Sequence, residues 1–504
     1  MSKKSIDKWQ FGDFQTPKKL AHKIVDILKV ERNIKPDIIL EPTCGTGAFI
    51  EAALTNFENC KLFGFDINQS YIEQAEISIQ RHFSFNEVTL QYSDFFEKNW
   101  KKFLPKMKGY ILILGNPPWV TSSELSILNS RNFPKKSNFQ NRRGIESITG
   151  SGNFDISEWM LLQYVDWLSS RDGTIAVLCK YSVARKVMKS IEKNSKRCFS
   201  SSIYEIDAKA YFGASVRACC FILSTSLNHS DCAVYDNLDS KKPCYLIGER
   251  NGWIIRDTTG YEKWKHLAGQ DLKYVWRSGI KHDCSKVMEL EKVGDFFKNG
   301  FGNQYSLESE YLYPLLKSSD IGNSRTNTYR KLLLVTQKFV GEETSKIKTQ
   351  APQTWQYLLT HDEYLRKRKS SIYKNRPSYS IFGIGDYTFK KWKIAVSGFY
   401  KKLNFCLIGN FNEKPVLFDD TVNFLSFDTE EEARFIFTLL TSQPALEFLS
   451  SMIFWDDKRP ISIDILRRLS IKEVATELGM LDRYIDWAGA VQVTPSGQLK
   501  LGLA

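Results

Sequence analysis

The sequence lacks the cysteine patterns that would indicate a structural metal or a disulfide framework. Its ten cysteines are spread over 504 residues, and no two of them have the Cys-x-x-Cys spacing. That spacing is the usual signature of a zinc module, and dense cysteine marks small secreted domains. We therefore expect reduced, packed cysteines, no metal ion and a cytoplasmic protein.

The chain also lacks a long apolar run. No stretch approaches the roughly 20 residues that a membrane-spanning helix needs, and the start, from Met1 to Lys4, has no apolar signal region. With 42% hydrophobic and 25% charged residues, the composition is that of an ordinary globular protein. The length predicts two domains, with a third as the alternative, and no membrane partner.

A tetrapeptide, Asn116-Pro117-Pro118-Trp119, follows the apolar run of residues 110–114. An amino group on an aromatic ring is a poor nucleophile until acceptors draw its hydrogens out of the ring plane. The Asn116 side chain and the Pro117 backbone each offer a carbonyl oxygen for this purpose. The Trp119 indole offers a face on which a base would stack, worth about 1–3 kcal/mol. The alternative is a Pro-Pro turn that only ends a strand.

A glycine-rich turn lies upstream, between a short β-branched run at residues 38–40 and a helical pattern at residues 48–54. Gly45 and Gly47 fall at this strand-to-helix junction, where backbone can approach a ligand closely. Such a loop can hold a nucleotide-like cofactor. A turn that serves packing alone is the alternative.

Acidic residues follow the next two expected strands. Residues 61–65 form a strand-like run that ends at Asp66, about 20 residues beyond the glycines, where a doubly wound fold places the carboxylate that binds ribose hydroxyls. Residues 88–91 are followed by Asp94 and Phe95, which we expect to meet an adenine ring. Because carboxyl ends of parallel strands share one edge of a sheet, these residues should gather at a single site.

Together these segments resemble the N6-adenine DNA methyltransferases with the gamma order of motifs. Residues 11–17 look like the family's N-terminal motif, residues 40–49 like its cofactor loop, and residues 116–119 like its catalytic motif, with Trp119 where another aromatic is more usual. Residues 211–223 resemble a later motif whose aromatic, here Phe212, stacks on the base. The resemblance spans about residues 8 to 225 and implies S-adenosylmethionine as the cofactor.

The resemblance also implies the site residues. The expected catalytic residues are Asn116, Pro117, Pro118, Trp119 and Phe212. The expected cofactor-binding residues are Phe14, Gln15, Thr16, Pro17, Glu41, Thr43, Gly45, Gly47, Asp66, Ile67, Asp94, Phe95 and Asn116.

Positive charge is concentrated in one part of the chain. Residues 321–410 contain 17 Lys and Arg against 5 Asp and Glu, which accounts for 12 of the net charge of +13. Such a segment favours a polyanion as partner, here double-stranded DNA, because each neutralised phosphate releases counterions. A solvated lysine-rich helix face is the alternative. The candidate DNA-binding residues are Arg366, Lys367, Arg368, Lys369, Lys374, Asn375, Arg376, Lys390, Lys391 and Lys393.

The expected fold is α/β: a Rossmann-like methyltransferase domain with a mostly parallel sheet, joined to a C-terminal α+β target recognition domain. We place the catalytic domain at residues 1–240, a connecting region at 241–290 and the recognition domain at 291–504. Strand-like runs in the last part lie at residues 331–335, 393–396, 405–408 and 422–426, and helical patterns at 430–440 and 445–451. A long basic loop is expected at residues 122–154.

The expected function is site-specific methylation of a flipped adenine in a prokaryotic restriction-modification system. A separate cognate endonuclease is implied by the resemblance alone. Cleavage by this chain is not expected, because the Pro36-Asp37 pair has no Asp/Glu-x-Lys close after it. The alternatives are methyltransferases acting on cytosine N4, RNA or protein glutamine, and a catalytically silent DNA-binding protein. Adenine comes first because Asn rather than Ser opens the tetrapeptide.

Overall fold

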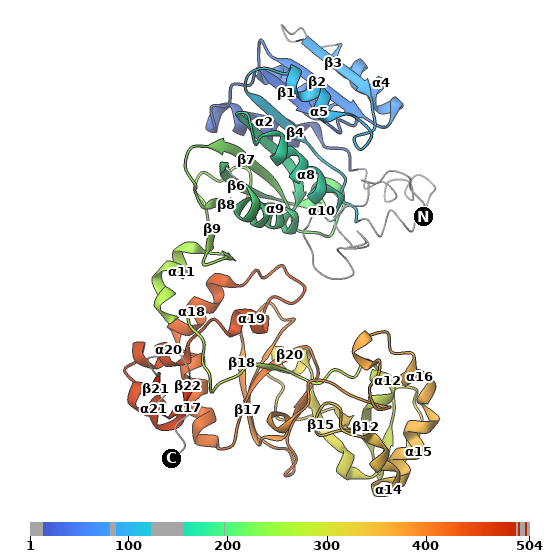
Figure 1. Cartoon of the computed structure of the whole chain (residues 1–504). Coiled ribbons are helices and arrows are strands. Elements are labelled where there is room, and N and C mark those ends of the chain that lie inside the picture. Colours follow the sequence, from blue (N-terminus) through green and yellow to red (C-terminus); the bar gives the residue numbers. More distant parts are fainter. Residues whose placement is uncertain are drawn as a thin grey trace. The chain divides into compact units, whose positions relative to one another are not determined.

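The computed structural model forms two compact units, Met1–Thr259 and Gly260–Ala504 (Figure 1). It describes residues 14–80, 87–121, 155–195, 197–489, 492–493 and 499–500. The expected basic loop at residues 122–154 and the first part of the N-terminal motif, residues 11–13, lie outside the described residues. Within the described ranges, no helix combines the length and the apolar character needed to cross a membrane.

The first unit is built on one ten-stranded sheet with the order β10-β9-β8-β6-β7-β5-β4-β1-β2-β3. The five strands from β3 to β5 are parallel to one another. They confirm the strands expected near residues 38, 61, 88 and 110 and include one further parallel strand, β5. Their bounds are β1 (Ile38–Glu41), β2 (Lys61–Asp66), β3 (Glu87–Tyr92), β4 (Ile111–Gly115) and β5 (Gly173–Lys180).

The other half of this sheet is mixed rather than parallel. Strand β7 runs antiparallel to β5 and β6, β8 is parallel to β6, and β9 and β10 form an antiparallel edge. Strands β9 and β10 lie in the region expected to be a connection, so that region contributes to the sheet of the first unit. The bounds are β6 (Cys198–Ile206), β7 (Ala218–Ser226), β8 (Cys232–Tyr235), β9 (Tyr245–Arg250) and β10 (Trp253–Ile255).

Helices cover both faces of the parallel half. Ala176 and Leu178 of β5 belong to the same buried cluster as residues of α2 and α3. Ile175 and Val177 alternate with them, are also buried, and point to the opposite face, because successive strand residues do so. Burial on both faces explains why β4 and β5 are continuous apolar runs. The helices of this unit are α2 (Lys18–Asp26), α3 (Ala48–Asn56), α4 (Gln69–Ile79), α5 (Trp100–Phe103), α8 (Ile156–Trp167), α9 (Tyr181–Asn194) and α10 (Ala208–Phe212), and α11 (Thr258–Trp264) leads into the second unit.

The strand order reverses between β1 and β4, since the chain moves from β1 to β2 and β3 on one side and from β4 to β5 on the other. In open α/β sheets such a switch point leaves a crevice at the carboxyl ends of the strands. Glu41 ends β1, Asp66 ends β2, and Asn116 follows β4. The fold therefore brings three expected site residues from distant parts of the sequence to one edge.

The second unit is α+β and contains two larger sheets, with the orders β11-β20-β17-β18 and β14-β13-β12-β16-β15-β19. All four strand-like runs expected here are strands, and both expected helices are present. The strands are β11 (Arg277–Ser278), β12 (Glu289–Val293), β13 (Phe296–Lys298), β14 (Gln304–Tyr305), β15 (Leu312–Leu316), β16 (Lys331–Leu334), β17 (Trp392–Ser397), β18 (Phe405–Ile408), β19 (Leu417–Phe418) and β20 (Val422–Phe427), with β21 (Gln492–Val493) and β22 (Leu499–Lys500) as a separate pair. The helices are α12 (Ser285–Met288), α13 (Ser318–Gly322), α14 (Ile347–Gln350), α15 (Pro352–Thr360), α16 (Asp362–Arg366), α17 (Glu430–Leu440), α18 (Gln443–Met452), α19 (Ile463–Leu466), α20 (Ile471–Glu477) and α21 (Leu481–Ala488).

Lys393 lies inside this unit, not on its surface. It is on β17, between β18 and β20, and only 1% of the residue is exposed. Its ammonium group donates a hydrogen bond to the Lys390 carbonyl oxygen at 2.8 Å. Burial lowers the pKa of Lys393 to about 7. The expectation that Lys393 contacts DNA is therefore wrong, because its amino group is buried within the second unit and bonded to a backbone carbonyl.

Burial of this amine predicts a pH-dependent cost to stability. The pKa of Lys393 is lower in the folded state, so the unfolded chain binds the proton more tightly and wild-type stability should rise between pH 7 and the ordinary lysine pKa. Lys393→Met should therefore be more stable than the wild type at pH 7, and its advantage should shrink by about 2 kcal/mol at pH 9. Urea unfolding at both pH values measures this. If the difference in unfolding free energy between Lys393→Met and the wild type were the same at both pH values, the lowered pKa of Lys393 would be contradicted.

Candidate active site

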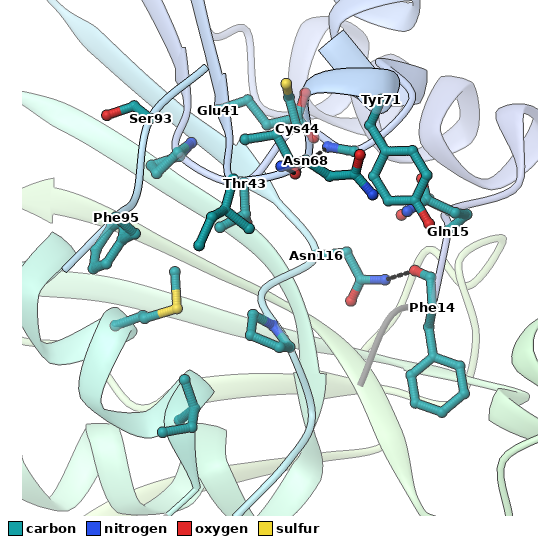
Figure 2. Close-up of a pocket in the computed structure, with 18 of the residues that line it drawn as sticks. Phe14, Gln15, Glu41, Thr43, Cys44, Asn68, Tyr71, Ser93, Phe95 and Asn116 are labelled. Atoms are coloured by element: carbon teal, nitrogen blue, oxygen red, sulfur yellow. Dashed lines mark hydrogen bonds between the residues drawn. The ribbon is translucent and has the colours of Figure 1, made fainter. Parts of the chain in front are cut away.

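A cavity of about 560 Å³ opens at the carboxyl ends of β1 to β4 (Figure 2). Its volume is within the range of small-molecule cofactor sites. It is lined by residues 14–16, 41–45, 48, 66–69, 71, 92, 93, 95, 96, 116, 118, 120, 156 and 160. The lining thus combines the N-terminal segment, the glycine loop, the ends of β2 to β4 and one face of α8.

The glycine loop depends on the absence of side chains at two positions. Gly45 and Gly47 have φ of +51° and +84°, in the left-handed region that favours glycine. A Cβ at Gly45 would lie 2.5 Å from the Gln15 side-chain oxygen, and one at Gly47 would lie 2.9 Å from the Ala75 Cβ. Gly45 therefore lets the N-terminal segment approach the loop, whereas Gly47 serves the packing of α3 on α4.

The Asp66 carboxylate joins two loops at the cavity wall. Oδ2 accepts a hydrogen bond from the Gly45 N–H and Oδ1 accepts one from the Asn68 N–H, both at 2.8 Å. The first bond reaches across to the glycine loop, and the second fixes the turn that leads into α4. Asp66 is therefore held in one position at the end of β2, where it lines the cavity.

Three buried polar atoms at this cavity have no hydrogen-bond partner within the described residues: Glu41 Oε2, Thr43 Oγ1 and Asn116 Oδ1. Glu41 is 2% exposed, and burial together with the nearby Asp66 charge raises its pKa well above the ordinary value. Buried polar atoms in proteins almost always have partners. Unpartnered atoms on one cavity wall therefore indicate a ligand with hydrogen-bond donors.

The charge of the lining restricts what that ligand can be. Two carboxylates, Glu41 and Asp66, face the cavity, and no Lys, Arg or His is among its described lining residues. The two acids would repel a polyphosphate, and this lining has no cationic side chain to offset that repulsion. S-adenosylmethionine carries an ammonium group, a sulfonium centre and ribose hydroxyls, so the two acids and the unpartnered Glu41 and Thr43 oxygens fit this cofactor.

The Asn116 side chain is held with its oxygen available. Nδ2 donates to the Phe14 carbonyl oxygen at 2.7 Å, the bond drawn in Figure 2. A carbonyl oxygen can only accept, so the amide must present its nitrogen to Phe14 and its oxygen elsewhere. This leaves Asn116 Oδ1 as a buried acceptor at the cavity wall, without a partner in the part of the chain that the structure describes.

The N-terminal segment connects the glycine loop with this amide. Gln15 Oε1 accepts hydrogen bonds from the Thr46 N–H at 3.0 Å and from the Thr46 hydroxyl at 3.2 Å. Phe14, one residue earlier, supplies the carbonyl that holds Asn116. Two adjacent residues thus bond to the loop after β1 and to the residue after β4, which sets the distance between them.

An aromatic cluster lies beside the amide. The Trp119 ring is 5.2 Å from the Phe212 ring and 5.6 Å from the Phe14 ring, measured between centroids. Trp119 is 5% exposed, and its indole N–H donates to the Leu178 carbonyl oxygen at 3.3 Å. A base between Trp119 and Phe212 would need parallel rings about 7 Å apart, twice the ~3.5 Å contact distance. Here the two planes meet at 73°, so the expected sandwich does not fit this arrangement.

Most of the residues expected to bind the cofactor line the cavity. The exceptions are Pro17, which precedes α2, Gly47, which packs on α4, and Asp94, whose Oδ1 accepts from the Phe96 N–H at 2.8 Å and shapes the turn after β3. The expected residues that do line it are Phe14, Gln15, Thr16, Glu41, Thr43, Gly45, Asp66, Ile67, Phe95 and Asn116.

Several lining residues were not predicted from the sequence. Asn68 and Tyr71 follow Asp66 closely, and they could have been found by including the residues just after the expected ribose-binding carboxylate. Ser93 and Phe96 flank the expected Asp94-Phe95 pair. Lining residues also come from α8, at positions 156 and 160, one helical turn apart. They had no detectable signal, because an apolar helix face looks the same whether it meets a core or a cofactor.

The expected DNA-binding residues other than Arg368 fall into three groups. Arg366, Lys367 and Lys390 are ion-paired with Asp362, Glu363 and Asp428. Lys393 is buried, as described above. The exposed ones with no side-chain partner among the described residues are Lys369, Lys374, Asn375, Arg376 and Lys391.

Arg368 has a structural role, which corrects the expectation that it binds DNA. Its guanidinium donates to the carbonyl oxygens of Leu365 and Ser380 at 2.8 and 2.7 Å. It also lies 3.7 Å from the centroid of the Tyr373 ring. Burial lowers the pKa of Arg368. These contacts tie the end of α16 to the following segment and leave the guanidinium occupied within the protein.

Comparison with known proteins identifies relatives over nearly the whole chain. The profile of the family described as "N-6 DNA Methylase" matches residues 4–251. The chain is 44% identical over 471 residues to "Type II methyltransferase M.NspV" of Nostoc sp. (strain ATCC 29411 / PCC 7524), covering 93% of this chain and 98% of that protein. It is 29% identical over 109 residues to "Type II methyltransferase M.VspI" of Vibrio sp. (strain 343), covering 21% and 25% of the two chains.

Among solved structures, the fold is similar to that of the Type IIL restriction-modification enzyme MmeI in complex with DNA. The TM-score is 0.51 at 11% sequence identity, and the match covers 90% of this chain and 64% of that one. At this identity the likeness concerns the fold. It extends over both units, so the second unit also has a structural counterpart.

Within the described residues, no group of three or more His, Cys, Asp or Glu side chains could hold a metal ion.

The raised pKa of Glu41 predicts how cofactor affinity depends on pH. In the free protein Glu41 keeps its proton to higher pH than an ordinary carboxyl. A cationic ligand favours the ionised form, so S-adenosylmethionine should bind with release of a proton and its affinity should rise with pH over the range in which Glu41 titrates. Glu41→Gln should remove this pH dependence. Calorimetry in buffers of different ionisation enthalpy counts the protons. Unchanged proton release in the variant would show that another group is responsible.

Proposed function

Because the chain belongs to the N-6 DNA methylase family and is a methyltransferase that uses S-adenosylmethionine, we propose that it transfers the methyl group to N6 of an adenine in duplex DNA. The observation that carries this proposal is the Asn116 amide. Its nitrogen is bound to the Phe14 carbonyl, and its oxygen is a buried acceptor without a described partner. An acceptor held in this way suits an amino group that must lose its conjugation with the ring.

Two acceptors would act on the amino group. Asn116 Oδ1 accepts one hydrogen, and the Pro117 carbonyl oxygen, which belongs to the same short turn after β4, accepts the other. Both interactions strengthen as the nitrogen becomes tetrahedral, so they lower the barrier instead of merely binding the base. Since β4 is buried along its whole length, the turn is a rigid support for both oxygens.

The cofactor would bind along the acidic side of the cavity. Glu41 and Thr43 would hold its amino acid part through their unpartnered oxygens, and Asp66 would meet its ribose hydroxyls. Bound S-adenosylmethionine supplies an electrophilic methyl group. Holding the two reactants in alignment contributes most of the acceleration, and the Phe14–Gln15 segment sets that alignment because it bonds to both the cofactor loop and Asn116.

The base would have to leave the duplex to reach this site. Trp119 is the aromatic next to the acceptors, but Phe14 and Phe212 cover its indole in the present arrangement. We propose that the Phe212 ring turns aside when the base enters. Phe212 is the last residue of the five-residue helix α10, directly before Gly213 with φ of +70°, so few contacts need to change.

Several features support duplex DNA as the substrate. The relative that covers nearly the whole chain bears the name of a type II methyltransferase, and the solved structure with the same fold was determined with DNA. The second unit carries exposed basic residues without partners among its described residues, including Lys369, Lys374 and Lys391. We propose that this chain is the modification enzyme of a restriction-modification system in the cytoplasm and that a separate endonuclease reads the same site.

The substrate base is tested by sequencing the DNA of a host that expresses the enzyme, using a method that distinguishes modified bases. The expected result is N6-methyladenine at one short recurring sequence. N4-methylcytosine at such a sequence would overturn the adenine assignment and leave the amino-group mechanism in place. Unmodified DNA, with RNA or protein labelled by radioactive cofactor, would overturn the proposed substrate class.

The catalytic role of Asn116 predicts a specific kinetic defect. Asn116→Ala should lower the single-turnover rate about a hundredfold or more, because it removes an acceptor that acts mainly in the transition state. Affinity for S-adenosylmethionine should change little, since Glu41, Thr43 and Asp66 remain. Transfer of labelled methyl groups under saturating cofactor and DNA measures the rate, and calorimetry measures the affinity. A rate within a few-fold of the wild type would remove Asn116 from the mechanism.

A further inference from the structure

A tight turn in the second unit exposes two adjacent apolar side chains. It lies between β16 and α14, and its tip is formed by Phe339 and Val340, which are 57% and 41% exposed. The Glu342 N–H donates to the Phe339 carbonyl oxygen at 3.2 Å, and Gly341 has φ of +89°, as the third position of a type II turn requires. Exposing a phenylalanine and a valine at one tip costs free energy unless a partner covers them.

The turn is held rigidly, so this exposure is part of the fold. Gln337, at its base, is 2% exposed and donates to the Glu342 carbonyl oxygen at 2.6 Å. The Gln337 side-chain oxygen accepts from the Ile381 N–H at 2.9 Å. The Lys338 N–H donates to Glu342 Oε2. These bonds close the base of the turn and attach it to a second segment of the chain.

That second segment brings cations to the apolar tip. Thr336 and Thr344, on either side of the turn, donate to the carbonyl oxygens of Tyr379 and Ser378. A Cβ built at Gly341 would lie 3.9 Å from an Arg376 guanidinium nitrogen. We call the resulting patch the tip surface. It consists of Lys338, Phe339, Val340 and Arg376, together with Lys374 and Asn375, which precede Arg376 in the same segment; all six are exposed.

The charge of the tip surface favours an anionic partner. The side chains of Lys338, Lys374 and Arg376 have no ion-pair or hydrogen-bond partner among the residues that the structure describes. Of the two acids that follow the tip, Glu342 is occupied by the Lys346 ammonium group and the Lys338 N–H. Glu343 alone does not balance three cations, so an apolar tip stands in a positive field.

We propose that the tip surface is a DNA-contacting element in which Phe339 packs against the bases while Lys338, Lys374 and Arg376 neutralise neighbouring phosphates. The inference rests on the proposed function, because it takes duplex DNA as the partner. An aromatic face stacks on any base, and apolar side chains flanked by cations are used to enter a base step. Val340 gives the tip a second apolar contact for the same step.

The test compares Phe339→Ala with Phe296→Ala. Phe296 is also an exposed phenylalanine of the second unit, 49% exposed on β13, but its neighbour Lys298 is paired with Glu291. The probe is a fluorescein-labelled duplex that carries the sequence found methylated in the host. Fluorescence anisotropy should show that Phe339→Ala binds about 5- to 150-fold more weakly, the range for removing one base stack. Phe296→Ala should bind like the wild type.

Salt dependence separates the apolar contribution from the ionic one. Phe339→Ala should keep the wild-type slope of log K against log salt, because it removes no charge. Lys374→Ala combined with Arg376→Ala should reduce that slope by roughly 0.9 for each phosphate that is no longer neutralised. Circular dichroism and unchanged affinity for S-adenosylmethionine confirm that each variant is folded.

Two outcomes overturn the inference. One is binding of Phe339→Ala to the duplex within twofold of the wild type. The other is an equal decrease in affinity for Phe339→Ala and Phe296→Ala, which would indicate a general effect of removing exposed aromatics. Failure of the proposed function is distinguishable, since the wild-type enzyme would then leave the DNA of its host unmodified and would not retain labelled duplex fragments of that DNA.

Discussion

The hydrogen bond from Asn116 Nδ2 to the Phe14 carbonyl oxygen is the contact on which the organisation of the site depends. It decides which end of the amide is exposed to a substrate, and it joins the residue after β4 to the segment before α2. That segment is in turn bonded to the glycine loop through Gln15 and Thr46. The position of the Asn116 side-chain oxygen relative to the glycine loop is therefore set by backbone and amide groups from three separate parts of the chain.

The electrostatics of the cavity follow from the same construction. Glu41 and Asp66 come from the ends of adjacent strands, and burial together with the Asp66 charge raises the pKa of Glu41. A cofactor with positive charge favours the ionised carboxylate, so Glu41 should ionise more readily when the cofactor is bound. The second unit differs in the sign of its charge: some of its exposed Lys and Arg side chains lack partners among its described residues. The chain thus combines an acidic pocket, which suits a cationic cofactor, with exposed basic residues, which suit the proposed DNA partner.

The sequence predicted the parallel strands, the glycine loop and the cavity residues at strand ends, because buried parallel strands are continuous apolar runs and their carboxyl ends must meet at one edge. It did not predict which residue of a motif would face the ligand. Pro17, Gly47 and Asp94 lie within correct motifs but serve a helix start, a helix contact and a turn. It also overestimated the basic surface, since Lys393 is buried and Arg368 binds backbone carbonyls. Composition counts charges, whereas burial and pairing decide which of them remain available.

The proposed entry of a base requires the closed aromatic cluster at Trp119 to open. Turning Phe212 aside would give up its contacts with the Trp119 and Phe14 rings, each worth about 0.5–1.5 kcal/mol. A base stacked on the indole would return about 1–3 kcal/mol. This gain is close to the free energy lost when Phe212 gives up its two ring contacts. Removing the base from the duplex costs a few kcal/mol more, least where the base is mismatched or unpaired. The remaining cost must come from interactions outside the aromatic cluster: the two acceptors at Asn116 and Pro117, and the DNA contacts of the second unit. On the proposed function, base entry is therefore coupled to recognition, because the site alone would supply too little free energy to hold a base that the rest of the protein has not recognised.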